Sequence, residues 1–218
     1  MEHIESLLSI YDSHLDEIEM LKLQVYNFFL LNKDLNSGLP PAVHSVKARV
    51  KDREHLKDKL ERKISDGTEM NDDNFFDEIT DLAGVRVMHL YQDQFEKIHN
   101  AIMAHIEKGN WVLGEKPKAY TWDPESKSYF EKFGLEVKQK ESFYTSIHYL
   151  VKPHEKFPFY CEIQVRTLFE EIWGEIDHSM NYPHPTDNIA CKEQLRVLSK
   201  LVGAGSRLAD SIFRSKES

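Results

Sequence analysis

The segment from residue 158 to residue 182 constrains the fold most, because two periodicities follow one another in it. The apolar residues Phe159, Cys161, Ile163 and Val165 alternate with the polar residues Tyr160, Glu162, Gln164 and Arg166. This period of two predicts a strand over 158–166 with one buried face and one polar face. Thr167 and Glu170 then form a capping box that opens a helix. The polar face carries a carboxylate, an amide and a guanidinium, which makes it a candidate functional surface.

The remaining periodic segments predict a mixed sheet packed with helices. Helices are expected over 3–32, 42–64, 93–107 and 192–213, and further strands over 83–91 and 143–151. Gly and Pro interrupt the chain at 36–41, and residues 115–134 predict a long functional or mobile loop. The pattern favours the α+β class, with an N-terminal helical extension at 1–40, a core domain at 41–185 and a C-terminal helical extension at 186–218.

Composition restricts the class of partner and the compartment. The net charge of −9 makes a large nucleic-acid-binding surface an unfavoured interpretation, although a local basic patch remains open. The two cysteines, Cys161 and Cys191, favour a reducing cytoplasm over a disulfide framework. The N-terminal residues lack the pattern of a signal peptide, and no apolar run has the length of a membrane span. We therefore expect a cytoplasmic protein without a membrane partner.

A basic segment at 49–63 is unusual in so acidic a chain. Its cations are Arg49, Lys51, Arg53, Lys59, Arg62 and Lys63. One interpretation is the solvated face of a helix, in which the cations pair with acids one turn away. The other is a cradle for polyphosphate, because several cations converge near one helix start. The pattern leaves both interpretations open.

Two acidic residues next to predicted strands are candidate metal ligands. Asp81 precedes the strand at 83–91, and Glu162 lies on the polar face of the strand at 158–166. If the two strands are neighbours, the two carboxylates could hold one Mg²⁺, which prefers hard oxygen ligands. Asp81 alone is more typical of a turn or a helix cap. Arg86, inside an apolar strand, needs an acidic partner or an aromatic plane. Carboxylates beside many cations predict metal-assisted phosphoryl transfer.

A third polar set lies in the strand at 143–151. Tyr144, Ser146 and His148 share one face. That face is either a polar sheet surface open to water or an aromatic platform for a nucleobase. His178 and Tyr182, four residues apart on the following helix, either close the site or are polar groups of the core. The chain contains no Walker A loop, no G-x-G-x-x-G motif and no H-E-x-x-H motif.

In this order, the segments resemble the RelA/SpoT-type alarmone synthetase domain in its small single-domain form. The motifs are R-x-K at Arg49 and Lys51, D-x-A-G-x-R from Asp81 to Arg86, Y-x-S-x-H from Tyr144 to His148, E-I-Q-V-R-T from Glu162 to Thr167, and W-x-x-x-x-H-x-x-x-Y from Trp173 to Tyr182. The resemblance covers residues 40–185 and implies a nucleotidyltransferase-like fold. It also implies transfer of pyrophosphate from ATP to the 3′-hydroxyl of GDP or GTP, which gives (p)ppGpp and AMP.

The resemblance also implies roles for individual residues. For ATP, Arg49 and Arg86 would sandwich adenine, and Lys51, Lys59 and Arg62 would hold the phosphates. Asp81 and Glu162 would be catalytic and bind Mg²⁺, with Glu162 also assisting the attacking hydroxyl. Tyr144 would stack on the acceptor base, and His148, Gln164 and Arg166 would line the acceptor side. The helical extensions imply a homo-oligomer, as in small members of this family.

The acceptor half departs from the family pattern. Phe143 stands where the family has Gly, Thr145 replaces a frequent basic residue, and Pro183 replaces a Lys. Phe143 is expected to reshape the acceptor loop. Two alternatives therefore stay open: a toxic relative that modifies the 3′ end of tRNA or adenine nucleotides, and a catalytically silent nucleotide-binding module. Retention of Asp81 and Glu162 argues against the silent module.

Overall fold

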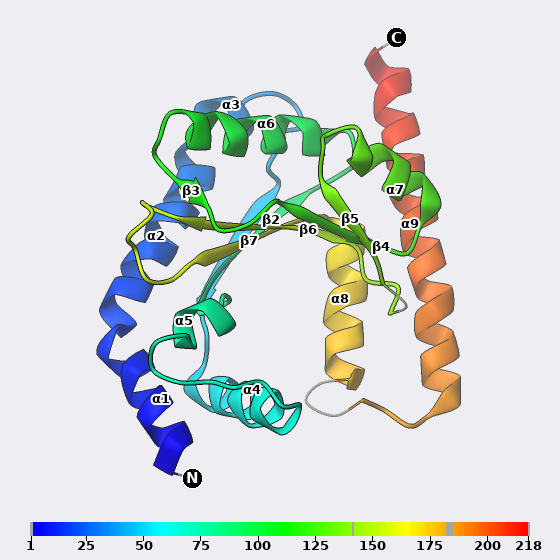
Figure 1. Cartoon of the computed structure of the whole chain (residues 1–218). Coiled ribbons are helices and arrows are strands. Elements are labelled where there is room, and N and C mark those ends of the chain that lie inside the picture. The colour runs from blue at the N-terminus through cyan, green and yellow to red at the C-terminus, as the bar shows by residue number, and fades with distance from the viewer. Residues whose placement is uncertain (1, 141, 182–184, 218) are drawn as a thin grey trace.

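A computed structural model describes residues 2–140, 142–181 and 185–217 of the chain (Figure 1). Its helices are α1 (Glu2–Ser13), α2 (Leu15–Leu31), α3 (Lys33–Asn36), α4 (Arg53–Ser65), α5 (Phe75–Glu78), α6 (Gln94–Glu107), α7 (Pro124–Glu131), α8 (Leu168–Asn181) and α9 (Ile189–Glu217). Its strands are β1 (Ser45–Val50), β2 (Ala83–His89), β3 (Val112–Leu113), β4 (Lys118–Thr121), β5 (Glu136–Gln139), β6 (Ser146–Lys152) and β7 (Cys161–Thr167).

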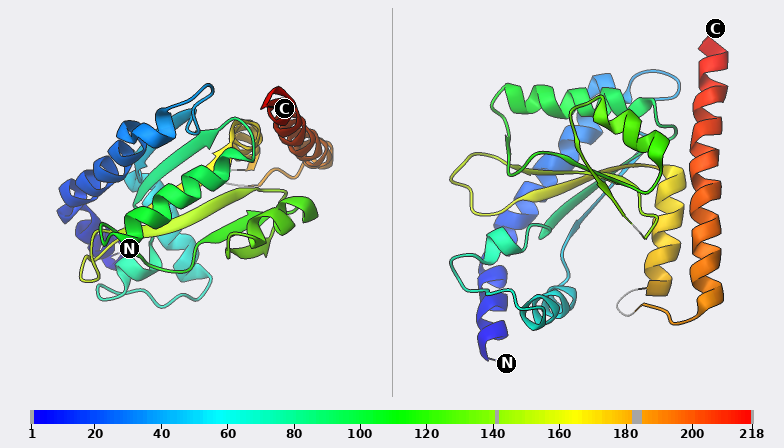
Figure 2. Two further views of the ribbon diagram at one scale, coloured as in Figure 1. Left: turned by 90° about the horizontal axis from the view of Figure 1, so that it is seen from above. Right: turned by 45° about the vertical axis from the view of Figure 1, so that its right-hand side comes forward.

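Within these described residues, seven strands form one mixed sheet. The strand order is β1-β2-β7-β6-β4-β5, and the short β3 pairs with β6. Strands β2 and β7 run parallel, as do β4 and β5, whereas the other pairs are antiparallel. Helix α6 lies over one side of the sheet, and α8 stands on the other side next to α9 (Figures 1 and 2). The predicted α+β fold with a mixed sheet and helical extensions is confirmed.

The two faces of the central strands differ as the alternation predicts. Cys161, Ile163 and Val165 of β7 are fully buried in the main hydrophobic core. Helix α2 packs against β1, β2 and β7 and contributes the buried residues Val25 and Phe29. Burial of such side chains stabilises the fold by about 1.5–3 kcal/mol each. The opposite face of β7 is left for polar side chains, and α8 follows it directly.

The capping box between β7 and α8 is also confirmed. The backbone N–H of Thr167 donates to Glu170 at 2.7 Å, and the N–H of Glu170 donates to the Thr167 hydroxyl at 3.2 Å. Burial raises the pKa of Glu170 to about 7, against the hydrogen bonds from Thr167 that lower it. This cap fixes the direction in which α8 leaves the sheet, and α8 carries one wall of the site described below.

The prediction of one helix over 42–64 is wrong for its first half. Residues 45–50 form β1, which pairs antiparallel with β2, with Arg49 opposite Gly84. The helix begins only at Arg53, because Asp52 is extended and caps it by accepting from the N–H groups of Glu54 and His55. Charged residues in β1 hid its strand character, and pairing with a buried strand overrides that weak local signal.

Two other segments also differ from the expectation. The predicted helix over 3–32 is divided at His14, whose ring nitrogen Nδ1 lies 2.9 Å from the carbonyl oxygen of Ile10. The predicted loop over 115–134 contains β4 and α7, and Asp123 caps α7 by accepting from Ser126. Both β4 and α7 are too short to show a clear periodicity in the sequence. Contacts with distant parts of the chain therefore determine their secondary structure.

Both terminal helical extensions pack against the rest of the domain. Leu7, Ile18 and Val25 of the N-terminal helices are fully buried, and Leu195 and Val202 of α9 are largely buried. Ion pairs also fasten α9 to the domain, from Arg207 to Asp123 at 2.8 Å and from Arg214 to Asp93 at 2.6 Å. Among the described helices, none combines the length and the hydropathy that crossing a membrane would require.

Candidate active site

A cavity of about 640 Å³ lies between the polar face of the sheet and α8. Its walls come from β1, β2, β7 and α8 and from Tyr144, which precedes β6. The lining residues are Lys47, Ala48, Arg49, Gly84, Val85, Arg86, Tyr144, Glu162, Gln164, Arg166, Gly174, Glu175, Asp177, His178 and Asn181. A volume of this size fits a nucleotide-sized ligand. The polar face of β7 predicted from alternation is therefore the floor of the largest cavity that we describe.

The polar side chains of β7 form one hydrogen-bonded row along that floor. Gln164 donates from Nε2 to Glu162 Oε2 at 2.7 Å, and Arg166 donates from Nη2 to Gln164 Oε1 at 2.6 Å. The guanidinium of Arg166 is buried and lies against Gly174 of α8, where a Cβ atom would approach its Nη1 to 2.7 Å. The row is held rigidly, because each side chain fixes the rotamer of the next.

Glu162 is ionised despite its burial. Burial raises the pKa of this carboxyl, but the hydrogen bonds that it accepts from His148 and Gln164 outweigh burial, so the pKa lies below its ordinary value. Nδ1 of His148 lies 2.9 Å from Glu162 Oε1 and must donate, since an ionised carboxylate only accepts. The Tyr144 hydroxyl then donates to His148 Nε2 at 3.0 Å. Tyr144, His148 and Glu162 thus form a continuous relay of hydrogen bonds.

Asp81 lies beyond the cavity walls, in a cluster with two lysines. Lys51 Nζ contacts Oδ2 of Asp81 at 2.9 Å, and Lys59 Nζ contacts Oδ1 at 2.8 Å. Burial raises the pKa of Asp81, but the two ammonium groups together lower it to about 2. Strands β2 and β7 are neighbours, as the two-carboxylate hypothesis requires. However, Glu162 faces Gly84 in their register, whereas Asp81 lies two residues before the start of β2.

The two arginines implied for adenine lie on adjacent strands. Arg49 of β1 lies across Gly84 of β2, and Arg86 of β2 points into the same cavity. The Arg86 guanidinium pairs with Glu171 at 2.9 Å and with Glu175 at 2.6 Å. Burial lowers the pKa of Arg86, and the two glutamates raise it above its ordinary value. Both arginines therefore border the cavity, and Arg86 keeps its charge there.

An adjoining cavity of about 380 Å³ continues from Tyr144 toward β4. It is lined by Tyr120, Lys140, Ser142, Tyr144, His148, Glu162 and Asp177. The ring of Tyr120 meets His148 edge-on with centroids 4.9 Å apart, and Lys140 Nζ lies 4.8 Å from the Tyr120 centroid. The guanidinium of Arg166 lies 5.4 Å from the centroid of Tyr144. Aromatic faces next to cations suit the stacking of a nucleobase.

Phe143 has a left-handed backbone, with φ of 62°. This conformation is costly for a residue with a Cβ, by about 1–2 kcal/mol, and it accounts for a glycine at this position in the family pattern. Phe143 contacts Trp122, with centroids 5.4 Å apart, and Arg196 of α9, 5.6 Å from its ring. The side chain that replaces glycine thus connects the loop before β6 to the turn between β4 and α7, and to α9.

The structure brings most of the predicted site residues together. Arg49, Arg86, Tyr144, Glu162, Gln164 and Arg166 line the main cavity, and His148 lines the adjoining one. Lys51 and Lys59 bind Asp81 outside the walls, and Arg62 is exposed on α4, also outside them. His178 lines the cavity, and Tyr182 lies outside the described residues.

Several residues that line the two cavities, on α8, on β4 and directly after β5, were not predicted from the sequence. Gly174, Glu175 and Asn181 share the face of α8 that carries His178, at helical spacings of three and four. That spacing, extended backward from His178, would have found them. Tyr120 lies in the segment 115–134, which reads as an aperiodic loop, and Lys140 lies outside every element predicted from the sequence. Fold and cavity together define an α+β protein with a nucleotide-sized site lined by cations and carboxylates.

Comparison with protein families identifies this class more closely. Residues 48–187 match the family described as the region found in RelA / SpoT proteins, so the chain belongs to that family. GTP pyrophosphokinase YwaC of Bacillus subtilis (strain 168) is 24% identical over 186 residues, which cover 83% of this chain and 80% of that protein. The family resemblance of the motifs is confirmed, and these relatives support a pyrophosphotransferase.

Solved structures share the fold along nearly the whole chain. Small alarmone synthetase 1 from Bacillus subtilis has a TM-score of 0.69 and 21% identity, with coverage of 96% of this chain and 97% of that chain. A GTP pyrophosphokinase family protein from Streptococcus pneumoniae has a TM-score of 0.67 and 20% identity, with coverage of 94% and 91%. Small alarmone synthetase 1 has also been solved bound to its product pppGpp, with a TM-score of 0.69 and 20% identity.

Proposed function

We propose that this protein transfers pyrophosphate from ATP to the 3′-hydroxyl of GDP or GTP, which yields (p)ppGpp and AMP. The 3′-oxygen attacks the β-phosphorus of ATP, and the bond from that phosphorus to the oxygen shared with the α-phosphate breaks. We also propose a cytoplasmic location, where both nucleotides occur. Cys161 and Cys191 are free thiols, consistent with a reducing compartment.

One observation carries the proposal: Glu162 lies between the two halves of a continuous site. Arg49 and Arg86 border the cavity on the side of β1 and β2, and Tyr144 and His148 border it toward β6. A donor nucleotide on the arginines and an acceptor base on Tyr144 would meet near Glu162. Its ionised carboxylate can accept the proton of the attacking hydroxyl, or orient that hydroxyl by a hydrogen bond. Gln164 and Arg166, in line with Glu162, would contact the acceptor.

Asp81 and Glu162 have the donor chemistry that Mg²⁺ requires, because both are anionic oxygen ligands at neutral pH. When bound, Mg²⁺ neutralises charge on the transferred phosphates. Both oxygens of Asp81 already bind lysines. We therefore propose that Lys51 and Lys59 move from Asp81 to the ATP phosphates, with Arg62 contributing charge from α4, when Asp81 takes part in holding the metal.

Incubation with labelled ATP and Mg²⁺ tests the proposed reaction. The acceptors are GDP, GTP, ATP alone and deacylated tRNA, each in a separate reaction. We expect label to appear on GDP or GTP together with AMP. Label on none of the four acceptors, from a protein that binds ATP, would contradict the pyrophosphotransferase assignment.

A nucleic-acid 3′ end is the second candidate acceptor, with an adenine nucleotide as its small-molecule counterpart. Tyr120 and Lys140, beyond Tyr144, give an acceptor side that extends past one nucleobase. A second aromatic ring and a cation suit a neighbouring nucleotide and its phosphate. Label on tRNA alone, or on ATP alone, would establish one of these acceptors in place of GDP and GTP.

The Tyr144→Ala variant is expected to lose acceptor use selectively. Stacking of a base on an aromatic ring contributes about 1–3 kcal/mol, so acceptor use should fall roughly tenfold to a hundredfold. ATP affinity should be nearly unchanged, because Arg49 and Arg86 lie on the other side of the cavity. Separate titrations of ATP and of each acceptor measure the two effects.

Tyr144→Phe is the matched control, since it keeps the ring and removes only the hydroxyl bond to His148. A collapse of ATP affinity with intact acceptor affinity would reverse the assignment of the two halves.

We also propose that the protein is a homo-oligomer. Apolar residues on the outer side of α9 remain exposed in the single chain, among them Val197, Leu201 and Leu208. Such a stripe is typical of a surface covered by another subunit. Light scattering over a range of concentrations is expected to show a mass above 25.6 kDa. Leu201→Glu should reduce that mass, whereas Lys200→Glu, one residue away, should not. A monomer at every concentration would contradict the oligomer.

A further inference from the structure

Two carboxylates from successive turns of α8 contact the same guanidinium nitrogen. Nη1 of Arg86 lies 2.9 and 3.2 Å from the two oxygens of Glu171, and 2.6 Å from Oε1 of Glu175. One charged group on β2 therefore has two acidic partners, one on each of two successive turns of α8.

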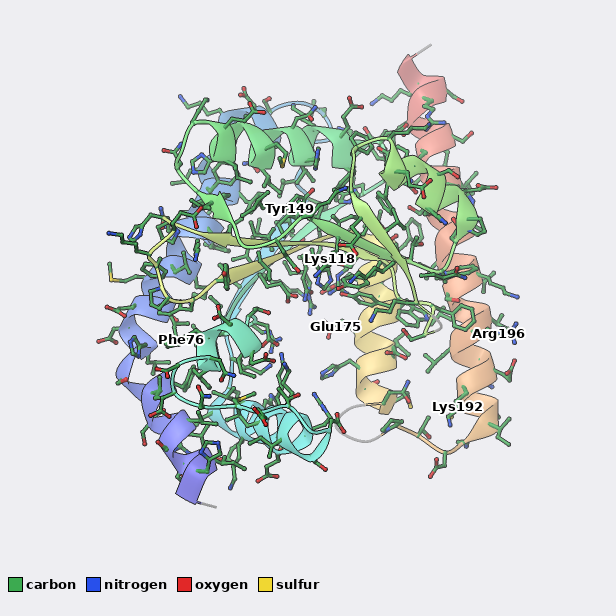
Figure 3. All side chains as sticks on the ribbon, viewed as in Figure 1. Phe76, Lys118, Tyr149, Glu175, Lys192 and Arg196 are labelled. Atoms are coloured by element: carbon green, nitrogen blue, oxygen red, sulfur yellow. The ribbon has the colours of Figure 1, made fainter. Side chains whose placement is uncertain are left out.

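The two glutamates differ in their surroundings. The Glu171 side chain is 7% exposed and also binds Lys47 at 3.0 Å and Arg166 at 3.5 Å. It lies beneath the cavity and ties the cations of three strands to α8. The Glu175 side chain is 57% exposed and lines the cavity itself. Figure 3 labels Glu175 on the side of α8 that is turned away from α9. The buried Glu171 therefore holds Arg86 in place, whereas the exposed Glu175 can turn away from Arg86 into solvent.

We propose that Glu175 is an autoinhibitory residue that competes with the donor nucleotide for Nη1 of Arg86. The inference rests on the proposed function, in which Arg86 contacts ATP. Glu171 keeps the guanidinium in place throughout, whereas Glu175 swings toward solvent when ATP enters. Glu175 also places a negative charge in the cavity that polyphosphate must enter. The residue therefore lowers the affinity for ATP without touching the transferred group.

The size of the effect follows from the exposure of Glu175. An exposed ion pair contributes about 0.2–1 kcal/mol, which corresponds to a factor of roughly 1.4 to 5 in affinity. Because Arg86 keeps its bond to the buried Glu171, loss of Glu175 should leave the guanidinium in position. Glu175→Gln is therefore expected to bind ATP roughly 1.4- to 5-fold more tightly, with an advantage that shrinks at high salt.

Equilibrium titration with ATP and Mg²⁺, without acceptor, measures this affinity in the full chain. Glu193→Gln is the matched control, since it removes the same charge from an exposed site on α9 and should leave ATP affinity unchanged. An unchanged ATP affinity in Glu175→Gln would overturn this inference and leave the proposed function intact. Weaker binding would show that the carboxylate contacts the nucleotide, and would overturn it too. If the unmodified protein binds no ATP, the proposed function fails and the inference with it.

The Arg86→Ala background separates competition from a general charge effect. Without the guanidinium, Glu175 has nothing to compete for, so adding Glu175→Gln to Arg86→Ala should not tighten ATP binding. An equal gain in both backgrounds would mean that Glu175 acts only through the overall charge of the cavity. That result would overturn the competition mechanism.

Discussion

The Asp81→Asn variant is expected to lose transfer activity by about a thousandfold or more. Asparagine keeps the shape of the side chain but removes the charge that would hold Mg²⁺, and metal stabilisation of the transition state contributes several kcal/mol. The same charge orders Lys51 and Lys59, the cations proposed to move to the ATP phosphates. Initial rates with labelled ATP and excess acceptor, across a range of Mg²⁺ concentrations, measure the loss.

The stability of this variant should also change, with a defined pH dependence. The pKa of Asp81 is lowered from 3.8 to about 2 in the folded chain. A lowered carboxyl pKa contributes stability that is fully present above the unfolded pKa and lost as pH falls through the folded one. The contribution is about 2 kcal/mol and disappears between roughly pH 4 and pH 2. Asp81→Asn should therefore melt about 4–8 °C lower at pH 7, and the difference should narrow in acid.

Glu78→Gln is the control for both measurements. Glu78 pairs with Lys63 of α4 at 2.7 Å, close to the Asp81 cluster in sequence, but it does not line the cavity. Its loss should cost little activity, because this half-buried pair lies outside the cavity walls. A folded Asp81→Asn protein with near-normal activity would contradict the catalytic assignment of Asp81.

The Glu162→Gln variant is expected to lose turnover while it retains ATP binding. General base or orienting assistance contributes roughly a hundredfold to ten-thousandfold, and an amide cannot accept the proton of the 3′-hydroxyl. The substitution also places an amide between His148 and Gln164, which both donate to the present carboxylate. Single-turnover rates and separate ATP titrations distinguish the two effects. Parallel losses of affinity and turnover would make Glu162 a binding residue instead.

Glu162→Asp keeps the charge but shortens the reach of the side chain. We expect it to recover part of the activity, because a carboxylate can still accept from His148 after a small shift of the ring. A glutamine variant and an aspartate variant that are equally inactive would point to geometry rather than charge as the requirement at this position.

The sequence predicted the centre of the fold well because strong local signals agree there. Alternation through Cys161, Ile163 and Val165 identified β7, and Thr167 with Glu170 identified the start of α8. Both signals depend on neighbours a few residues apart. The motif residues on β7 consequently fell into one cavity as soon as the strand was placed.

The periphery was harder to predict because distant partners decide it. Strand β1 exists through its pairing with β2, more than thirty residues away, and its Lys47 and Arg49 conceal it in the sequence. Asp81 pairs with Lys51 and Lys59, which lie on the other side of a turn-rich segment of the chain. No regular residue spacing predicts that these lysines reach Asp81. The same holds for Glu171, whose three cationic partners lie on three strands.

The position of β1 at one end of the sheet gives the two halves of the site unequal mechanical support. β1 has a single strand neighbour, whereas β7 lies between β2 and β6. Local opening of an edge strand costs less free energy than opening of a central one. Arg49 therefore stands on an edge strand, where local opening costs less free energy, and Glu162 stands on a central strand, where it costs more. A nucleotide held between Arg49 and Arg86 would contact both β1 and β2. Part of its binding free energy would therefore go into suppressing the local opening of β1.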